Sequence, residues 1–301
     1  RTRLGRGQRV LIAGHLDTVP VTGNLPSTVE ETPDGVVIHG RGTVDMKGGV
    51  AVALKLACEL DQPRFDVTWV FYDHEEVDAS LNGLGRLAGN RPDLLEADFA
   101  VLMEPTGARV EGGCQGTIRI RITAEGRAAH SARAWMGKNA IHGLAGVLAR
   151  LASHEPKRIE VEGLEYREGL NAVRISGGVA GNVIPSQAWV EINYRFAPDK
   201  SADEALGYLE EVFEGYSFEV TDIAPAARPG LDRPLAQDFV DAVGGEAFPK
   251  YGWTDVSRFS ALGIPAVNYG PGDSSLAHRD DERCPAEHLR TCIDGLRRWL
   301  A

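Results

Sequence analysis

The sequence predicts an α/β protein with a mostly parallel sheet, into which a smaller α+β domain is inserted. Three observations predict this fold. Short apolar segments typical of strands alternate with helical segments near both ends of the chain. Several of the apolar segments end in acidic residues or histidines, as strands do at the ligand-binding edge of a parallel sheet. Between the two ends, apolar and charged residues alternate with a period of two, which is typical of a sheet with one open face.

The composition is ordinary for a soluble globular protein, with 301 residues of which 43% are hydrophobic and 25% charged. A formal net charge of −11 argues against nucleic acid or an anionic membrane surface as a partner. No apolar run approaches the ~20 residues of a membrane span, and no signal peptide is visible. The four cysteines form no C-x-x-C pair, so we expect a reducing cytoplasm.

The first part of the chain contains strands and helices in alternation. The segment 9–14 is short and apolar, and 66–72 is rich in the aromatic and β-branched residues that strands favour. In chain order, the expected elements are a strand at 9–14, a strand at 36–38, a helix at 50–57, a strand at 66–72, a helix at 81–87 and a strand at 97–103.

The middle of the chain begins after Gly112-Gly113 and has a different texture. The segment 117–123 alternates apolar and charged residues. The order βαββαβ that follows matches a ferredoxin-like split βαβ sandwich. Its elements are a strand at 117–123, a helix at 139–151, strands at 172–179 and 188–196, a helix at 202–213 and a strand at 216–220.

The α/β texture resumes after the loop 224–234. A helix at 235–243, an apolar strand at 265–269 and an amphipathic helix at 285–300 complete the chain. The sheet of the larger domain is therefore shared between both chain ends, with the smaller domain inserted between them.

Asp45 lies in the glycine-rich stretch Gly40–Gly49, between a predicted strand and a predicted helix. Ligands collect at such strand ends in α/β sheets, and glycines let the backbone come close to whatever the aspartate binds. The simpler interpretation of this stretch alone is a tight turn with a solvated acid.

Five features fall at the ends of predicted strands or in the loops after them. Each has a simpler explanation, such as a hydrogen-bonded loop histidine or a solvated pair of glutamates, but together they predict a metal site. Histidines with carboxylates suit zinc, cobalt or manganese, whereas calcium prefers oxygen alone. So many ligands suit two metals that share a bridging carboxylate. The features are His15 with Asp17, Asp45, Glu75 with Glu76, Glu104, and His278.

These motifs also resemble a known family. The stretches Gly14–Pro20, Gly40–Gly49, Glu75-Glu76, Glu104–Thr106 and Ala277-His278 look like the five metal-site motifs of the M20 metallopeptidases, in the same order. The resemblance spans nearly the whole chain. It implies a co-catalytic dizinc amide hydrolase whose catalytic domain has the dizinc exopeptidase fold.

Within the family, the sequence is most similar to the actinobacterial succinyl-diaminopimelate desuccinylases. The similarity rests on Gly112–Thr117, Gly126–Arg133 and Tyr251–Phe259. It implies hydrolysis of N-succinyl-LL-2,6-diaminopimelate to succinate and LL-2,6-diaminopimelate, in lysine and diaminopimelate biosynthesis. Another M20 activity, such as acetylornithine deacetylase or dipeptidase, is the nearest alternative. A non-catalytic dimeric binding protein that keeps the fold is an alternative of another class.

The resemblance assigns the metal ligands to two sites. It implies that His15, Asp45 and Glu104 hold one zinc. Asp45, Glu76 and His278 would hold the other, so Asp45 would bridge the two ions. Co²⁺ or Mn²⁺ are possible substitutes for Zn²⁺.

Three further residues receive catalytic roles from the resemblance. Asp17 would hydrogen-bond the free nitrogen of His15 and fix its tautomer. Glu75 would be the general base, which takes a proton from water and gives it to the leaving amine. His130 would stabilise the oxyanion from the other subunit, with His142 a poorer candidate.

The resemblance also implies a division of labour between domains. Residues 1–113 and 224–301 would form the catalytic domain, and 114–223 an inserted lid through which a homodimer forms. A pairing of Cys114 with His130 as nucleophile and base is a weak alternative, because no motif fixes that geometry.

Four residues match or neighbour substrate-binding positions of the desuccinylases: Asn182, Arg195, Arg258 and Thr254. An arginine suits the capture of a carboxylate, although Arg195 could equally be paired on the lid sheet.

Three features depart from the family pattern. Many desuccinylases carry arginines where this chain has Cys114-Gln115, and aspartate is more usual where it has His74. The chain also starts only fourteen residues before His15, where family members usually have several tens more, which is consistent with truncation.

Overall fold

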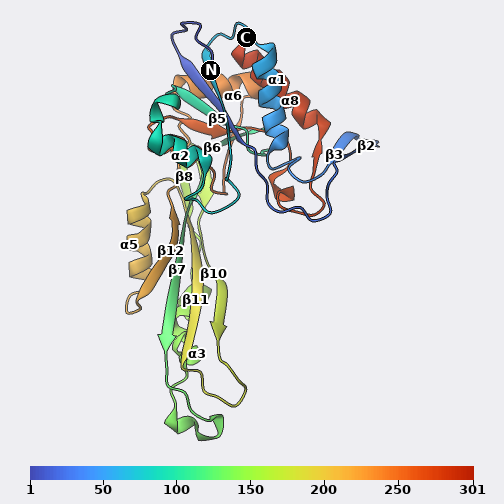
Figure 1. Cartoon of the computed structure of the whole chain (residues 1–301). Coiled ribbons are helices and arrows are strands. Elements are labelled where there is room, and N and C mark those ends of the chain that lie inside the picture. Colours follow the sequence, from blue (N-terminus) through green and yellow to red (C-terminus); the bar gives the residue numbers. More distant parts are fainter.

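The computed structural model describes residues 1–301. It has two units, each built around its own sheet (Figure 1). The large unit contains a six-stranded sheet, a three-stranded sheet and both chain termini. The elongated small unit, residues 116–224, contains a four-stranded sheet. None of the helices is long and apolar enough to span a lipid bilayer.

The six-stranded sheet is mixed and mostly parallel, as predicted. Its strand order is β13-β6-β14-β5-β1-β4, and only β14 and β6 are antiparallel. The predicted strands at 9–14, 66–72, 97–103 and 265–269 are confirmed within this sheet. Its members are β1 (Arg9–His15), β4 (Asp66–Tyr72), β5 (Phe99–Leu102), β6 (Val110–Gly112), β13 (Ala247–Pro249) and β14 (Ala266–Asn268).

Helices cover both faces of this sheet, which explains why its strands are apolar throughout. Alternate residues of β1 enter two different cores: Val10 and Ile12 pack in one, Leu11 and Ala13 in the other. The first core is closed by α1 (Lys47–Glu59), α6 (Pro234–Val243) and α8 (Ala286–Leu300), and the second by α2 (Gly83–Asn90) and α7 (Val256–Ala261).

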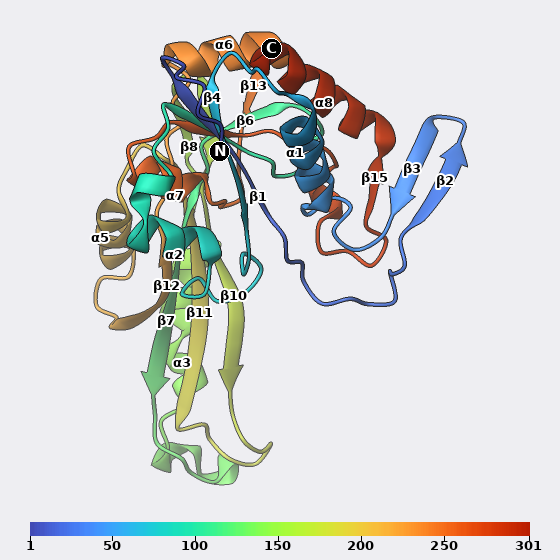
Figure 2. The ribbon, with the colours of Figure 1, turned by 45° about the horizontal axis from the view of Figure 1, so that its top comes forward.

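The predicted strand at 36–38 forms, but the expectation that it leads to the edge of the main sheet was wrong. It is β3 (Gly35–His39), which pairs with β2 (Thr28–Thr32) and β15 (Arg283–Pro285) in the separate three-stranded sheet. Figure 2 shows β2 and β3 standing away from the main sheet. No residue of β3 is fully buried, so the strand could not occupy the centre of a sheet covered on both faces.

The small unit has the predicted order of elements. Its antiparallel sheet has the strand order β10-β11-β7-β12, and the helices pack on one face of it. The predicted helix at 139–151 is divided in two near Leu144. The elements are β7 (Gly116–Glu125), α3 (Ala140–Gly143), α4 (Ala145–Ala152), β10 (Gly169–Gly177), β11 (Gln187–Phe196), α5 (Ala202–Val212) and β12 (Phe218–Ala224).

The two faces of this sheet differ as the alternating sequence requires. Ile118, Ile120 and Ile122 of β7 are buried under the helices. Odd-numbered residues of the same strand lie on the open face. The domain boundaries at 113/114 and 223/224 remain predictions, and they fall close to the points where the chain passes from one sheet to the other.

A hairpin that is not among the predicted elements connects the two units. It consists of β8 (Arg158–Val161) and β9 (Leu164–Arg167), and it packs Leu164 and Tyr166 near Ala247 of β13. Three short 3₁₀ helices complete the structure: η1 (Pro92–Leu94), η2 (Ser131–Met136) and η3 (Ser274–Leu276).

Candidate metal centre and active site

His15 and Asp45 form the centre of a cluster of possible metal ligands. His15 is the last residue of β1 and is only 1% exposed. Its Nε2 lies 3.0 Å from Asp45 Oδ1. Asp45 comes from the loop between β3 and α1, so it follows a strand of the three-stranded sheet, whereas His15 ends a strand of the six-stranded sheet.

The second oxygen of Asp45 faces another histidine. His278 Nε2 lies 3.2 Å from Asp45 Oδ2 and 3.1 Å from Glu76 Oε1. Each carboxylate oxygen of Asp45 therefore faces a different imidazole. This is the arrangement that a carboxylate bridging two cations requires.

Glu104 completes the set of five predicted ligands. It follows β5, is buried, and places Oε1 4.0 Å from His15 Nε2. One ligand atom from each of His15, Asp45 and Glu76 lies within 4.8 Å of the others. Two imidazoles and three carboxylates are a donor set that fits borderline divalent cations.

A glycine allows these ligands to come together. A Cβ on Gly49 would lie 2.2 Å from the carbonyl oxygen of Met103. Only glycine therefore lets the start of α1, directly after Asp45, pack against the end of β5, directly before Glu104.

Asp17 anchors the loop that carries Glu75 and Glu76. Its two carboxylate oxygens accept hydrogen bonds from the backbone N–H groups of these residues, both at 3.1 Å. Its backbone carbonyl lies 3.1 Å from His15 Nδ1, whereas its carboxylate is 3.7 Å away. Asp17 thus reaches His15 mainly through its backbone and holds the two glutamates with its side chain.

Arg41 and Glu282, which were not among the predicted site residues, position Asp45 from behind. Glu282 is 1% exposed, and its Oε1 accepts hydrogen bonds from the N–H groups of Val44 (2.9 Å) and Asp45 (3.1 Å). Arg41 Nη1 donates to Glu282 Oε2 (2.9 Å) and to the carbonyl of Arg279 (3.0 Å). The pair therefore links the Asp45 loop to the His278 loop. The signal in the sequence is an arginine inside the glycine-rich stretch that carries Asp45.

We expect Glu282→Gln to weaken both folding and metal binding. Glutamine keeps an acceptor oxygen but leaves the buried Arg41 charge unpaired, which costs about 2 kcal/mol of unfolding free energy. Loss of support for the Asp45 loop should reduce metal affinity about 10- to 100-fold. Denaturation of chelated protein and metal titration measure the two effects.

Asp281→Asn is the matched control, because Asp281 is an exposed neighbour that pairs with Arg279 and Arg283. Equal behaviour of the two variants would show that Glu282 does not support the site.

The protein groups of the cluster shift one another's pKa values strongly. Burial raises the pKa of Glu75 to about 9, with the charge of Glu104 adding to the effect. Burial and the charge of Asp45 raise the pKa of Glu104 to about 8. Burial opposes protonation of His15, but the hydrogen bond to Asp45 and the nearby carboxylates outweigh it and raise its pKa to about 10.

Asp45 and His278 shift in opposite directions. Burial favours the neutral form of Asp45, but hydrogen bonds from His15 and His278 outweigh it and lower the pKa of Asp45. The hydrogen bond to Asp45 raises the pKa of His278 to about 9. Asp45 is therefore ionised at neutral pH, while His15, Glu75, Glu104 and His278 hold protons.

Metal binding at neutral pH should release protons. Groups whose pKa values lie near 8 to 10 are protonated below that range in chelated protein, and ligands must lose their protons to bind a cation. Metal affinity should therefore rise as pH increases from 6 through this range. Isothermal titration of Zn²⁺ at pH 7 in buffers of different ionisation enthalpy measures the release, and a heat independent of buffer would contradict it.

A cavity of about 670 Å³ lies beside the metal ligands, between the large and small units. The large unit contributes Glu75, Asn82, Trp253 and Arg258, and the small unit contributes Thr117, Arg119, Arg195 and Asp222. The cavity thus joins the predicted general base to residues of the predicted lid.

The four predicted substrate-binding residues fall in three places. Arg195 and Arg258 line the cavity. Thr254 is buried and donates a hydrogen bond to Asn268 Oδ1 (2.9 Å), so the structure does not bring it to the cavity. Asn182 lies in another part of the small unit, where its carbonyl accepts a hydrogen bond from the N–H of Ser131 (2.9 Å).

His130 lies beside Asn182, far from the metal ligands of its own chain. It forms an isolated bridge with Val183, just before η2. The segment around η2 (light green) is at the end of the small unit away from the large unit in both views (Figures 1 and 2). The ten residues of β7 run from the junction of the two units to that end of the small unit. The end that carries His130 therefore lies about 30 Å from the junction.

Cys114 is not a plausible partner for His130. It is fully buried near the junction of the units, and burial raises the pKa of its thiol to about 11. A buried, protonated thiol this far from the histidine is not an activated nucleophile.

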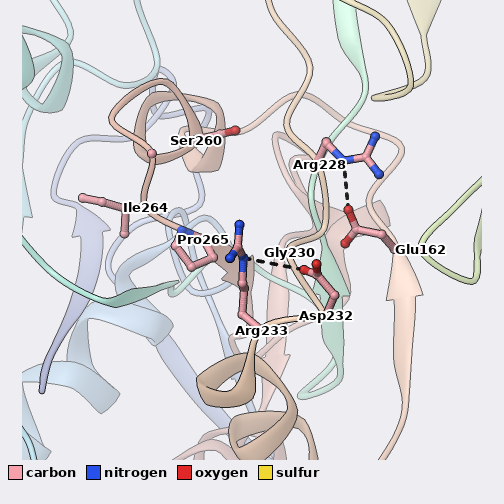
Figure 3. A pocket seen from close by; sticks show the side chains of 9 residues that line it. Glu162, Arg228, Gly230, Asp232, Arg233, Ser260, Ile264 and Pro265 are labelled. Carbon is pink, nitrogen blue, oxygen red and sulfur yellow. Dashed lines mark hydrogen bonds and ion pairs between the residues drawn. The ribbon is translucent and has the colours of Figure 1, made fainter.

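A second cavity, of about 280 Å³, contains none of the predicted site residues (Figure 3). Its charged groups are paired with one another: Arg228 with Glu162 at 2.9 Å, and Arg233 with Asp232 at 3.8 Å. The arginine-lined cavity beside Glu75 is therefore the better candidate for a substrate site.

Comparison with known proteins is consistent with this geometry. The family model described as "Peptidase family M20/M25/M40" matches residues 11–301. The chain belongs to the M20 peptidase family. Membership in the family implies dependence on a divalent metal, and the clustered histidines and carboxylates provide a candidate site for it.

Two relatives are similar over the whole chain. A Mycobacterium tuberculosis H37Rv protein that carries the name of a succinyl-diaminopimelate desuccinylase, DapE, is 55% identical over 302 residues, which cover 100% of this chain and 84% of the relative. The succinyl-diaminopimelate desuccinylase of Corynebacterium glutamicum ATCC 13032 is 46% identical, covering 100% of this chain and 83% of the relative.

Solved M20 structures share the fold at low sequence identity. The M20 family metallo-carboxypeptidase Sso-CP2 of Sulfolobus solfataricus has a TM-score of 0.75 at 17% identity, covering 99% of this chain and 85% of that one. The YXEP protein of Bacillus subtilis, described as a dinuclear metal-binding M20 peptidase, has a TM-score of 0.67 at 18% identity, covering 98% and 81%.

Proposed function

We propose that this M20 protein hydrolyses N-succinyl-LL-2,6-diaminopimelate to succinate and LL-2,6-diaminopimelate, a step of lysine and diaminopimelate biosynthesis. The observation that carries the proposal is the placement of Asp45 between two histidines, with Glu75 beside them in an arginine-lined cavity. The 46% and 55% identical relatives, which carry the desuccinylase name, support this substrate.

The proposed ligand roles are those that the resemblance to M20 metallopeptidases implies, and contacts between the groups support them. His15, Asp45 and Glu104 would hold one cation, and Asp45, Glu76 and His278 the other. We propose two Zn²⁺ ions, with Co²⁺ or Mn²⁺ as substitutes. Bound divalent cations would polarise the scissile carbonyl and make a water molecule acidic enough to ionise near neutral pH.

Glu75 is the proposed general base. It lines the cavity and is bonded to no cation in the chain, so its carboxylate is available to water. Positive charge nearby would lower its raised pKa toward neutrality, where it can both accept and donate a proton. Glu75 takes the proton from the attacking water and gives it to the nitrogen of the leaving amine.

The cavity arginines suit an anionic substrate, although the whole chain is acidic. Arg195 and Arg258 present guanidinium groups to a space that also contains Glu75. The substrate carries several carboxylates, and guanidinium groups bind carboxylates in a fixed, paired geometry.

His130 and Asn182 are proposed to act in the active site of a partner subunit. Their side-by-side position at the outer end of the small unit, about 30 Å from the junction, supports a role outside their own chain's site. Residues 114–223 would then be a dimerisation lid, and residues 1–113 and 224–301 the catalytic domain. We also propose that the homodimer works in the cytoplasm.

Turnover of matched substrates tests the proposal. Protein loaded with two equivalents of Zn²⁺ should hydrolyse N-succinyl-LL-2,6-diaminopimelate with a higher kcat/KM than N-acetylornithine or a dipeptide. A preference for N-acetylornithine or the dipeptide would assign another M20 activity. Binding of the succinyl compound without hydrolysis would favour a non-catalytic binding protein.

A further inference from the structure

The three cavity arginines differ in how their charges are compensated. Arg258 Nε lies 2.5 Å from Asp255 Oδ1, and Asp255 is fully buried. The charge of Arg258 is therefore neutralised inside the large unit. The other two, Arg119 and Arg195, lie on the open face of the small unit's sheet.

Arg195 is a partly buried cation without an acidic partner. Its hydrogen bond within the chain joins Nε to Asn193 Oδ1 at 3.2 Å, and it forms no ion pair. Burial and the positive charge of Arg119 both lower its pKa. The negative charge of Asp222 opposes these two effects only in part. A further anion next to Arg195 would therefore stabilise it.

Strand register places Arg119 beside Arg195. On β7 and β11, Thr117 is opposite Arg195 and Arg119 is opposite Asn193. The two arginines are therefore diagonal neighbours on one face, with Cα atoms roughly 7–8 Å apart, which is within reach of long side chains. Both side chains line the cavity.

Asp222 holds Arg119 but leaves part of its guanidinium free. Arg119 Nε and Nη2 donate to the same oxygen, Asp222 Oδ2, at 3.1 and 2.7 Å. Arg119 Nη1 has no partner in the chain. Two positive charges with one negative charge leave one unit of positive charge at this end of the cavity.

We propose that Arg119, held by Asp222, binds a substrate carboxylate together with Arg195 and thereby determines substrate specificity. The inference rests on the proposed hydrolase function and adds Arg119 to its binding residues. The carboxylate lies away from the scissile amide, either at the end of the acyl group or at the far end of the amino acid.

Arg119→Met tests this when three substrates are compared. The parent is N-succinyl-LL-2,6-diaminopimelate, the N-butyryl analogue lacks the acyl carboxylate, and Nα-succinyl-L-lysine lacks the far one. We expect kcat/KM for the parent to fall about 10- to 100-fold, because a charge-assisted hydrogen bond is lost. The analogue that lacks the bound carboxylate should lose less than about threefold, since it never made this bond. That analogue identifies which carboxylate Arg119 binds.

Arg121→Met is the matched control. Arg121 lies on the same strand and face, but it pairs with Glu191 at 3.1 Å and stacks on Trp189 at 4.6 Å, away from the cavity. The Arg121→Met substitution should leave kcat/KM unchanged for all three substrates. Unchanged turnover of the parent by Arg119→Met, or an equal loss on all three substrates, would overturn the inference.

Failure of the proposed function would be visible separately, because wild-type protein would then not hydrolyse the parent. In that case calorimetric binding of the same three compounds to wild type and Arg119→Met decides the question. A smaller loss of affinity for one of the two analogues than for the parent supports the site, and an equal change in affinity for all three compounds refutes it.

Discussion

Glu75→Gln is expected to reduce kcat by about 10²- to 10⁴-fold, the range typical for loss of a general base. Glutamine is similar in size and shape but cannot accept a proton from water. Because Glu75 is not among the proposed ligands, metal content should not change. Steady-state kinetics together with metal analysis of the same sample measures both quantities.

Asp73→Asn provides the comparison for Glu75→Gln. Asp73 is an exposed carboxylate on the same loop, paired with Arg86 at 3.2 Å. It should keep nearly full activity and metal content. If Glu75→Gln lost its metals as well as its activity, Glu75 would be a ligand and the division of roles between Glu75 and Glu76 would be wrong.

The second large loss of kcat is expected when His130 is replaced. His130→Ala should lower kcat about 10²- to 10³-fold, the cost of removing one oxyanion donor. KM should change less, because the donor acts mainly on charge that develops in the transition state. His142→Ala, a change at another exposed histidine of the small unit, is the comparison variant.

Mixing variants tests whether His130 acts across a dimer. Glu75→Gln and His130→Ala are each nearly inactive alone. A mixed dimer would contain one site with an intact Glu75 from one chain and an intact His130 from the other, so activity should return when the two proteins are unfolded and refolded together. No recovery, in samples that sizing shows to be dimeric, would exclude a donor from the partner.

The main sheet was predictable because its strands leave a strong local signal. The segment 66–72 coincides with β4, since a run of aromatic and β-branched residues buried on both faces has few other conformations available. The sheet to which β3 belongs could not be predicted, because pairing partners such as Cys284 of β15 lie far away in the sequence.

The hairpin of β8 and β9 has a recognisable pattern in the sequence, although it is not among the predicted elements. Ile159, Val161, Leu164 and Tyr166 alternate with charged residues around Glu162-Gly163. Both turn residues have positive φ, 52° and 80°, which is the conformation of a tight hairpin turn. Alternation on both sides of a turn ending in glycine is a hairpin pattern.

The proposed ligands were recognisable from sequence because each lies in a short motif. The residues that hold these ligands in place were not recognisable. Glu282 acts by accepting hydrogen bonds from backbone N–H groups, and these carry no side-chain identity that a motif could record. The position of His130 depends on the direction in which ten residues of β7 run, which local patterns do not encode.

The five proposed ligands come from two different sheets. His15 ends β1, and Glu76 and Glu104 follow β4 and β5 of the six-stranded sheet. Asp45 lies in the loop after β3, and His278 in the loop before β15, of the three-stranded sheet. A pair of cations held by both groups would join the two sheets at the site, in addition to the contacts that α8 makes with β3 and β15. The binding free energy of the metals would then add to the free energy needed to unfold the three-stranded sheet. Removal of the metals would therefore destabilise this sheet, and unfolding of the sheet would weaken metal binding.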